Sequence, residues 1–189
     1  MSSAIFERDF DRLAPGSSLE TSGRTITEAD VTSFAALTGD WHPQHADAAW
    51  AAESPFGERI AHGMLVVSYA IGLLPIDPDR VVALRAVRDV VFKRPVPIGT
   101  TIRVEAEVAG LRPLGDEQGL VTLALRVRDS AGALLARLAV EALWRRGPVG
   151  EDGRPASAAG ANGAAAAAEG RRTGAEDELS PLRDGRVLL

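Results

Sequence analysis

The chain has 189 residues, of which 46% are hydrophobic and 25% are charged, and its formal net charge at pH 7 is −5. This composition is typical of a globular protein, and the negative charge argues against a broad basic face that would bind nucleic acid. Because the chain contains no cysteine, disulfides, thiolate catalysis and cysteine-ligated zinc are excluded.

The two ends of the chain differ from its middle. The N-terminal sequence MSSAIFERDFDRL has acids where a signal peptide needs an apolar stretch, and no run reaches the roughly 18 apolar residues of a membrane span. We therefore expect a cytoplasmic protein that does not enter a membrane. Residues 147–189 are rich in glycine and alanine and lack aromatic residues, so we expect a disordered tail after a folded domain of residues 1–146.

Helical signals begin after residues 10–22, which we expect to form a loop or a short strand. Thr27 can cap a helix that Gly39 ends. The apolar positions that fit one face of this helix are Val31, Phe34, Ala35 and Leu37.

The segment TGDWHPQHAD, residues 38–47, comes directly after this helix, so we expect it to lie on a loop. A short helix capped by Asp47 should follow and end before Pro55, and residues 56–61 should form a loop. The sequence HGMLVVSYAIGLLP, residues 62–75, is apolar nearly all round and predicts a central, fully buried helix.

After Pro78 the pattern is that of strands. Four β-rich segments follow, and residues 101–108 alternate apolar and polar side chains as in a sheet with one buried and one wet face. The sequence DSAG, residues 129–132, predicts a turn between the last two strands. Helices followed by four strands joined by short turns indicate an α+β domain, with an antiparallel sheet wrapped around one long buried helix.

Two motifs in this order carry a family resemblance. Gly39 and Asp40 precede His45 by a few residues, and His62-Gly63-Met64 follows seventeen residues later. The pair resembles the hydratase motif of the MaoC-like dehydratases and (R)-specific enoyl-CoA hydratases, which have the hotdog fold. The sequence VVFKRPVPIGTTIRVEAEV, residues 90–108, is also similar to a strand of that family, and the resemblance covers residues 23–144.

The chain departs from the family pattern at three positions. His42 stands where the family usually has asparagine, and Gln44 replaces an aliphatic residue. Ile71 occupies a position where better-known members carry a small polar residue. Ser68, one turn earlier, could substitute for that hydroxyl or could serve only in packing.

Hydration of a 2-enoyl thioester requires a base for the water, an acid for C2 and a donor that polarises the thioester carbonyl. The resemblance implies that Asp40 and His45 share the proton transfers and that the Gly63 N–H is the donor. The Gly63 N–H also has an independent warrant, because N–H groups in the first turn of a helix lack intrahelical partners and favour negative charge. The lack of a Cβ should let the substrate carbonyl approach.

Other residues are candidates for contacts with substrate, and each has a structural alternative. His62 could cap the central helix or hydrogen-bond to the motif loop, Trp41 could pack in the domain or at a dimer contact, and Arg94 could contact phosphates of coenzyme A or be a solvated cation. The candidate substrate-binding residues are His62, Met64, Ser68, Trp41 and Arg94.

No metal and no dissociable cofactor is expected, since coenzyme A or phosphopantetheine enters as part of the substrate. Asp40, His42, His45 and His62 could be imagined as a metal site, but the pair His42 and His45 lacks an obvious third ligand held in geometry. The leading interpretation is a hydratase or dehydratase that interconverts trans-2-enoyl and (R)-3-hydroxyacyl thioesters. The alternatives are a hotdog thioesterase and a non-catalytic or partner-dependent subunit that binds acyl thioesters. By analogy with the family we expect a homodimer whose sheets join.

Overall fold

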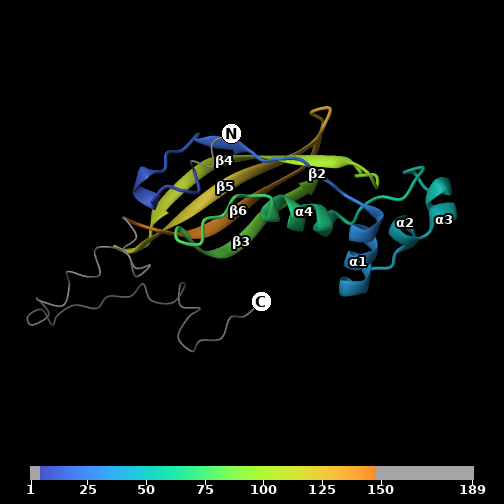
Figure 1. Cartoon of the computed structure of the whole chain (residues 1–189), viewed down its shortest axis with the longest axis horizontal. Helices are drawn as coiled ribbons and strands as arrows, with labels where there is room; N and C mark the ends of the chain where they lie inside the picture. The colour runs from blue at the N-terminus through green and yellow to red at the C-terminus, as the bar shows by residue number, and fades with distance from the viewer. Residues whose placement is uncertain (1–4, 148–189) are drawn as a thin grey trace, which may run out of the picture. The chain divides into compact units, whose positions relative to one another are not determined.

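The computed structural model describes residues 5–147 and builds them from one antiparallel sheet and a set of short helices (Figure 1). The expected tail lies outside the described residues except for Gly147, so its disorder stays a prediction. In chain order the elements are a 3₁₀ turn at Phe10–Arg12, β1 (Ser18–Glu20), β2 (Arg24–Thr25), α1 (Glu28–Thr38), α2 (Pro43–Ala46), α3 (Ala48–Glu53), α4 (Gly63–Gly72), β3 (Val81–Phe92), β4 (Thr101–Pro113), β5 (Gln118–Asp129) and β6 (Leu134–Arg145).

The sheet confirms the predicted α+β class. Its strand order is β1-β4-β5-β6-β3, every pairing is antiparallel, and the short β2 adds to β4. The predicted alternation holds in β4, where one set of side chains is fully buried because it faces the core: Ile102, Val104, Ala106 and Val108. The predicted turn joins β5 to β6, and the Asp129 carboxylate accepts hydrogen bonds from two backbone N–H groups within it.

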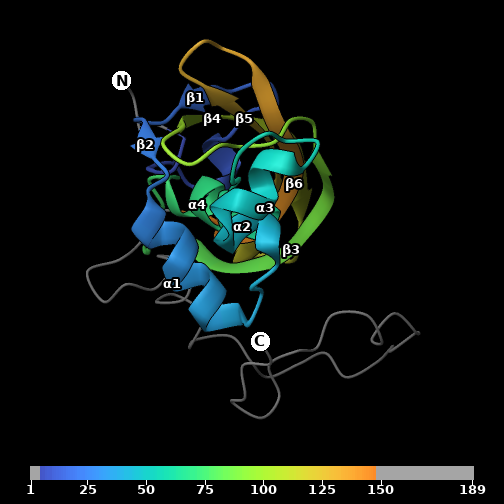
Figure 2. The ribbon, with the colours of Figure 1, turned by 90° about the vertical axis from the view of Figure 1, so that its right-hand side faces the viewer.

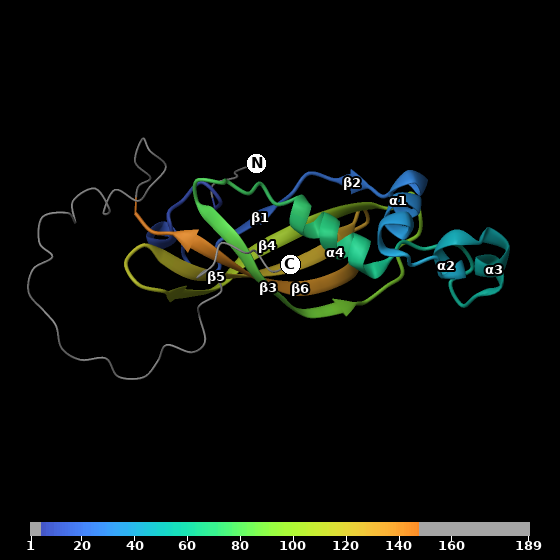
Figure 3. The same cartoon turned by 90° about the horizontal axis from the view of Figure 1, so that it is seen from below.

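Helix α4 lies against the inner face of the sheet, and the strands curve around it (Figures 2 and 3). Leu65, Val66, Val67 and Ala70 are buried there. The prediction that this helix is fully buried is wrong, because Met64 is 53% exposed and Ser68 is also exposed. One side of α4 is therefore open in the single chain.

Helix α1 is placed by its caps and by one polar cluster. Thr27 and Asp30 form a reciprocal capping box, and Gly39 ends the helix in the left-handed conformation, as predicted. Asp30 also accepts hydrogen bonds from Tyr69 of α4 at 2.6 Å and from Arg24 at 3.1 Å. The bond from Tyr69 is the main cause of an Asp30 pKa of about 2. This cluster fixes α1 against the middle of α4.

The four apolar positions that fit one face of α1 differ in burial. Leu37 is 83% exposed, and the buried residues of this helix are Val31 and Ala35. These two are one helical turn apart, so α1 contacts the domain through a stripe narrower than the apolar pattern suggested.

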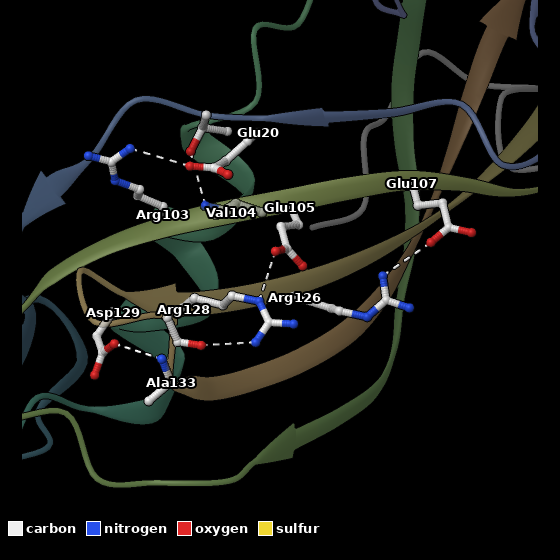
Figure 4. A network of polar contacts seen from close by, with 11 residues as sticks. Glu20, Arg103, Val104, Glu105, Glu107, Arg126, Arg128, Asp129 and Ala133 are labelled. Atoms are coloured by element: carbon white, nitrogen blue, oxygen red, sulfur yellow. Dashed lines mark hydrogen bonds and ion pairs between the residues drawn. The ribbon is translucent and has the colours of Figure 1, made fainter.

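The outer face of the sheet carries charged side chains in opposite-sign pairs across neighbouring strands (Figure 4). The pairs are Glu20–Arg103 at 3.3 Å, Glu107–Arg126 at 3.1 Å and Glu105–Arg128 at 2.9 Å. This is the wet face that the alternating pattern predicts. Among the described residues, no helix has both the length and the apolar character needed to span a membrane.

Candidate functional site

A cavity of about 610 Å³ opens at the N-terminal end of α4. Four parts of the chain line it: Phe34 and Thr38 of α1 with the motif residues Asp40, Gln44 and His45; Phe56 and residues 60–64 with Val66; Phe92 at the end of β3 with residues 93–96; and Leu135 with Ala136 of β6. The two sequence motifs therefore meet at one cavity, although seventeen residues separate them along the chain.

The motif segment is not only a loop, which corrects the prediction. Residues Pro43–Ala46 form the single turn α2, and Pro43 occupies its first turn, where a missing N–H is harmless. His42 caps this turn, because its Nδ1 accepts from the Gln44 N–H at 3.2 Å. An asparagine side chain could make the same bond, which supports the prediction that His42 is a structural replacement for asparagine. Asp47 caps α3, as predicted.

His45 is held by both ring nitrogens and is only 4% exposed. Its Nδ1 lies 2.7 Å from the carbonyl oxygen of Ile60, and its Nε2 lies 2.9 Å from Nε2 of Gln44. Because a carbonyl oxygen can only accept, Nδ1 carries the proton and Nε2 has the lone pair in the neutral ring. Burial lowers the pKa of His45 below its usual value, against the opposing effect of the Ile60 bond. The geometry therefore favours a neutral imidazole with Nε2 as its basic atom.

His62, directly before α4, contacts both His45 and the backbone of Asp40. Its ring stacks on that of His45 with centroids 3.8 Å apart, and its Nε2–H donates to the backbone oxygen of Asp40 at 2.9 Å. Of the two alternatives from the sequence, the bond to the motif segment is the one observed, and no side-chain cap of α4 is formed. His62 Nδ1 is buried and has no hydrogen-bond partner among residues 5–147.

Asp40 presents its carboxylate at the same place. One carboxylate oxygen accepts from the His42 N–H at 3.3 Å. Ligand-type atoms of Asp40, His45 and His62 lie within 4.8 Å of one another. The planes of the two stacked rings are inclined by only 27°, and ring lone pairs lie in the plane, so they do not converge on one tetrahedral ion. The cluster fits an acid–base pair better than a metal centre.

Gly63 is the first residue of α4, and its N–H has no hydrogen-bond partner in the described part of the chain. The reason given above for its missing side chain needs correction. A Cβ at Gly63 would lie 2.6–2.9 Å from ring atoms of Phe92, so that space is filled by Phe92. A side chain at this position would therefore have to displace the Phe92 ring, which is itself 50% exposed.

The structure brings some of the expected substrate contacts to the cavity and not others. His62, Met64 and Arg94 line it, whereas Trp41 and Ser68 are not among its lining residues. Trp41 is exposed, and the Ser68 hydroxyl donates to the backbone oxygen of Met64 at 2.8 Å.

The position of the family's small polar residue supplies no hydroxyl here. Ile71 is partly buried and packs against the hydrophobic core.

Sequence reasoning missed two residues of the site. Gln44 was noted only as a departure from the pattern, and Phe92 only as part of a strand. The proximity of Gln44 to His45 in the sequence was a usable signal, since neighbours in a one-turn helix can share a cavity. Phe92 gave no such signal, because its contact with Gly63 joins β3 to α4.

Comparison with known proteins gives consistent matches. The family described as "MaoC like domain" matches residues 11–129. Protein MaoC of Klebsiella aerogenes is 44% identical over 100 residues, which are 52% of this chain but only 30% of that protein. An (R)-specific enoyl-CoA hydratase of Aeromonas caviae is 37% identical over 106 residues, which are 56% of this chain and 77% of that enzyme.

A solved structure agrees with the expected fold. Rv0216 of Mycobacterium tuberculosis, which has a double hotdog fold, superposes with a TM-score of 0.66 at 26% identity and covers 86% of this chain and 52% of its own. The expectation of a hotdog fold is confirmed.

Proposed function

Because this chain belongs to the MaoC-like domain family, we propose that it is a hydratase or dehydratase of acyl thioesters. In the forward direction it adds water to a trans-2-enoyl thioester and forms the (R)-3-hydroxyacyl thioester. The observation that carries the proposal is the meeting of Asp40, His45 and the Gly63 N–H at one cavity. The acyl carrier is coenzyme A or an acyl carrier protein.

Asp40 and His45 act on the water. The water oxygen bonds to C3 while His45 Nε2 takes one of its protons, and the Asp40 carboxylate orients the water and stabilises the imidazolium that forms. Electron density moves from the C2–C3 double bond to the thioester oxygen, and the imidazolium then returns the proton to C2. The atoms balance without a metal or a redox partner, and dehydration follows the same steps in reverse.

The N-terminus of α4 stabilises the charge that develops on the thioester oxygen. The Gly63 N–H is free of protein partners in the described residues, and the helix dipole favours negative charge at this end. His62 keeps the Asp40 backbone and the His45 ring in place through its hydrogen bond and its stacking. It acts as a positioning residue.

The carrier should leave the cavity beside the cations that follow β3. Lys93 and Arg94 line the cavity, and Met64 contributes apolar surface to the same cavity. Phosphate groups of coenzyme A or phosphopantetheine would pair with these cations.

We also propose a cytoplasmic homodimer. Beyond β3 the sheet has no further strand among residues 5–147, and β3 exposes apolar side chains, namely Val82, Leu84 and Val87. An open apolar edge favours pairing with a second copy. Size-exclusion chromatography with light scattering should give a dimer at micromolar concentration, and a monomer would contradict this part of the proposal.

The test is an absorbance assay with crotonyl-CoA. The purified chain should consume the enoyl thioester band, and chiral analysis should identify the (R)-3-hydroxy product. Release of free thiol, detected with a thiol reagent, would instead identify a thioesterase. Binding without turnover of any enoyl or 3-hydroxyacyl thioester would identify a non-catalytic subunit.

A further inference from the structure

Gln44 places its side-chain amide on the atom of His45 that the proposed hydration uses as a base. Gln44 Nε2 lies 2.9 Å from His45 Nε2, while the proton on Nδ1 is committed to Ile60. A neutral imidazole has a single in-plane lone pair, here on Nε2. The Gln44 amide therefore donates to the only acceptor site that the ring offers.

The reacting water needs the same lone pair. A water molecule that gives a proton to His45 must first hydrogen-bond to Nε2, so the water and the amide cannot both occupy that position. The His45 ring is fixed, because it is buried, stacked on His62 and bonded to Ile60. The amide of Gln44 must be the partner that moves.

The surroundings of Gln44 allow this movement. Its backbone is fixed on both sides, since its N–H donates to His42 Nδ1 and its oxygen accepts from the Ile60 N–H. Its side chain is half-buried and lines the cavity. In the described residues its one side-chain hydrogen bond is the bond to His45. No other hydrogen bond in the described residues holds the far end of this side chain, so a change of its rotamer can move the amide away from Nε2.

We propose that Gln44 is a positioning residue that covers the base of the empty site and must be displaced by the reacting water when an acyl thioester binds. This inference rests on the proposed hydration. The bond between Gln44 and His45 is present only in the free protein, so it is lost equally in the substrate complex and in the transition state. Its effect therefore falls on KM and leaves kcat unchanged.

The charged groups around His45 have opposing effects on its pKa. Asp40 favours the imidazolium, whereas His42 and His62 oppose it, and Lys93 and Arg94 line the same cavity from the segment after β3. Gln44 differs from all of these, because it is neutral and donates directly to the lone pair. It therefore stabilises the neutral ring and acts in the same direction as burial.

The kinetic test compares Gln44→Leu with Gln118→Leu in the full chain, using crotonyl-CoA. Gln118 starts β5 and is not a lining residue, so it is a matched control for the same substitution. Loss of one neutral hydrogen bond corresponds to about a three- to tenfold change. Gln44→Leu should lower KM about three- to tenfold with kcat within about twofold, and Gln118→Leu should change neither. An unchanged or higher KM in Gln44→Leu would overturn the proposal.

A second variant should move the pH dependence. In Gln44→Glu the carboxylate accepts from the imidazolium, so the acid limb of kcat/KM should shift to higher pH. An unshifted limb would contradict direct contact with Nε2.

Nitrogen NMR of the chain labelled in its three histidines reads the contact without turnover. Wild type should show His45 as the Nδ1–H tautomer, and Gln44→Leu should move the His45 Nε2 resonance while Gln118→Leu does not. An Nε2 resonance that ignores Gln44→Leu would overturn the contact. Absence of wild-type turnover would defeat the proposed function instead, and the resonance would still report on Gln44.

Discussion

The outer face of the sheet and the cavity at the start of α4 differ in whether their polar groups have partners in the protein. On the outer face, Glu105 and Glu107 each meet an arginine of the neighbouring strand at about 3 Å. At the cavity, His62 Nδ1 and the Gly63 N–H have no partner within residues 5–147. Buried polar groups in folded proteins are nearly always hydrogen-bonded, and of these two groups the Gly63 N–H is the one that the proposed function gives to the substrate. The outer face of the sheet carries more charged side chains than the cavity, but the charges of Glu105 and Glu107 are already paired with arginines.

Substitutions of Asp40 or His45 test whether the cavity is the site of the reaction. They should have the largest effect on turnover. Asp40→Asn and His45→Ala should each lower kcat about 10²- to 10⁴-fold, the range for loss of a positioned acid or base. The decay of the crotonyl-CoA absorbance measures the rate, and an unchanged melting temperature shows that the fold is kept. Full activity in both variants would show that the site is assigned to the wrong residues.

Filling the space beside Gly63 should have the next largest effect. A Cβ in Gly63→Ala would press on the Phe92 ring and shift the start of α4, and a displacement of about 1 Å in a reacting group can lower the rate about 10²-fold. Steady-state kinetics on crotonyl-CoA would measure the loss. The double variant Gly63→Ala with Phe92→Ala should recover part of it, because the colliding ring is gone. A Gly63→Ala variant with wild-type kcat would mean that the Phe92 ring moves aside and that the start of α4 is not shifted.

The pH profile tests whether His45 is a neutral base. Burial opposes the charged ring and lowers its pKa, so a lower pH is needed to protonate it. We expect kcat/KM to be level between pH 7 and 8 and to fall about tenfold per pH unit below an apparent pKa that is under 6.5. Initial rates across pH 4.5–8 in buffers of constant ionic strength measure this. An acid limb centred above pH 7 would contradict the assignment.

The cluster between α1 and α4 gives a smaller effect, on stability. Tyr69→Phe removes a hydrogen bond to the Asp30 carboxylate and should lower the free energy of unfolding by about 1–2 kcal/mol, measured by urea titration at pH 7. Because the folded pKa of Asp30 is depressed to about 2, its contribution is complete above its unfolded value of 3.8 and is lost as the pH falls from 3.8 towards 2. The variant should therefore lose less stability than wild type between pH 4 and 2. Equal losses would contradict the role of Tyr69.

A break in an outer pair should have the smallest effect. Glu107→Gln removes the partner of Arg126, and exposed ion pairs contribute about 0–1 kcal/mol. The free energy of unfolding should change by less than about 0.5 kcal/mol, and turnover of crotonyl-CoA should stay at the wild-type value. A large change in kcat here would mean that the sheet face takes part in function.

Local chemistry explains which parts of the fold could be predicted. The Thr27 cap, the Gly39 stop and the Asp47 cap each depend on side chains within four residues, and all three are confirmed. The alternation in β4 is likewise a local pattern. Leu37 fits the apolar face of α1 yet is exposed, because an apolar residue on a helix is buried only if another element covers it.

Long-range packing explains what the sequence left open at the site. Asp40, His45 and His62 converge in the structure. The sequence could indicate this because their two motifs are recognisable as a pair. Whether Ser68 or Trp41 reached the cavity depended on the direction of α4 and of the motif turn, which no local pattern specifies. The position of the Gln44 amide depends on how residues 42–45 and residue 60 meet, since backbone bonds to both hold the turn.

The most direct test of the central claim is a crystal structure of the chain with a non-hydrolysable enoyl-CoA analogue. We predict the carbonyl oxygen at about 2.7–3.1 Å from the Gly63 nitrogen, with C3 facing a water between Asp40 and His45 Nε2. An analogue whose carbonyl lies elsewhere, or whose C3 points away from these two side chains, would contradict the account.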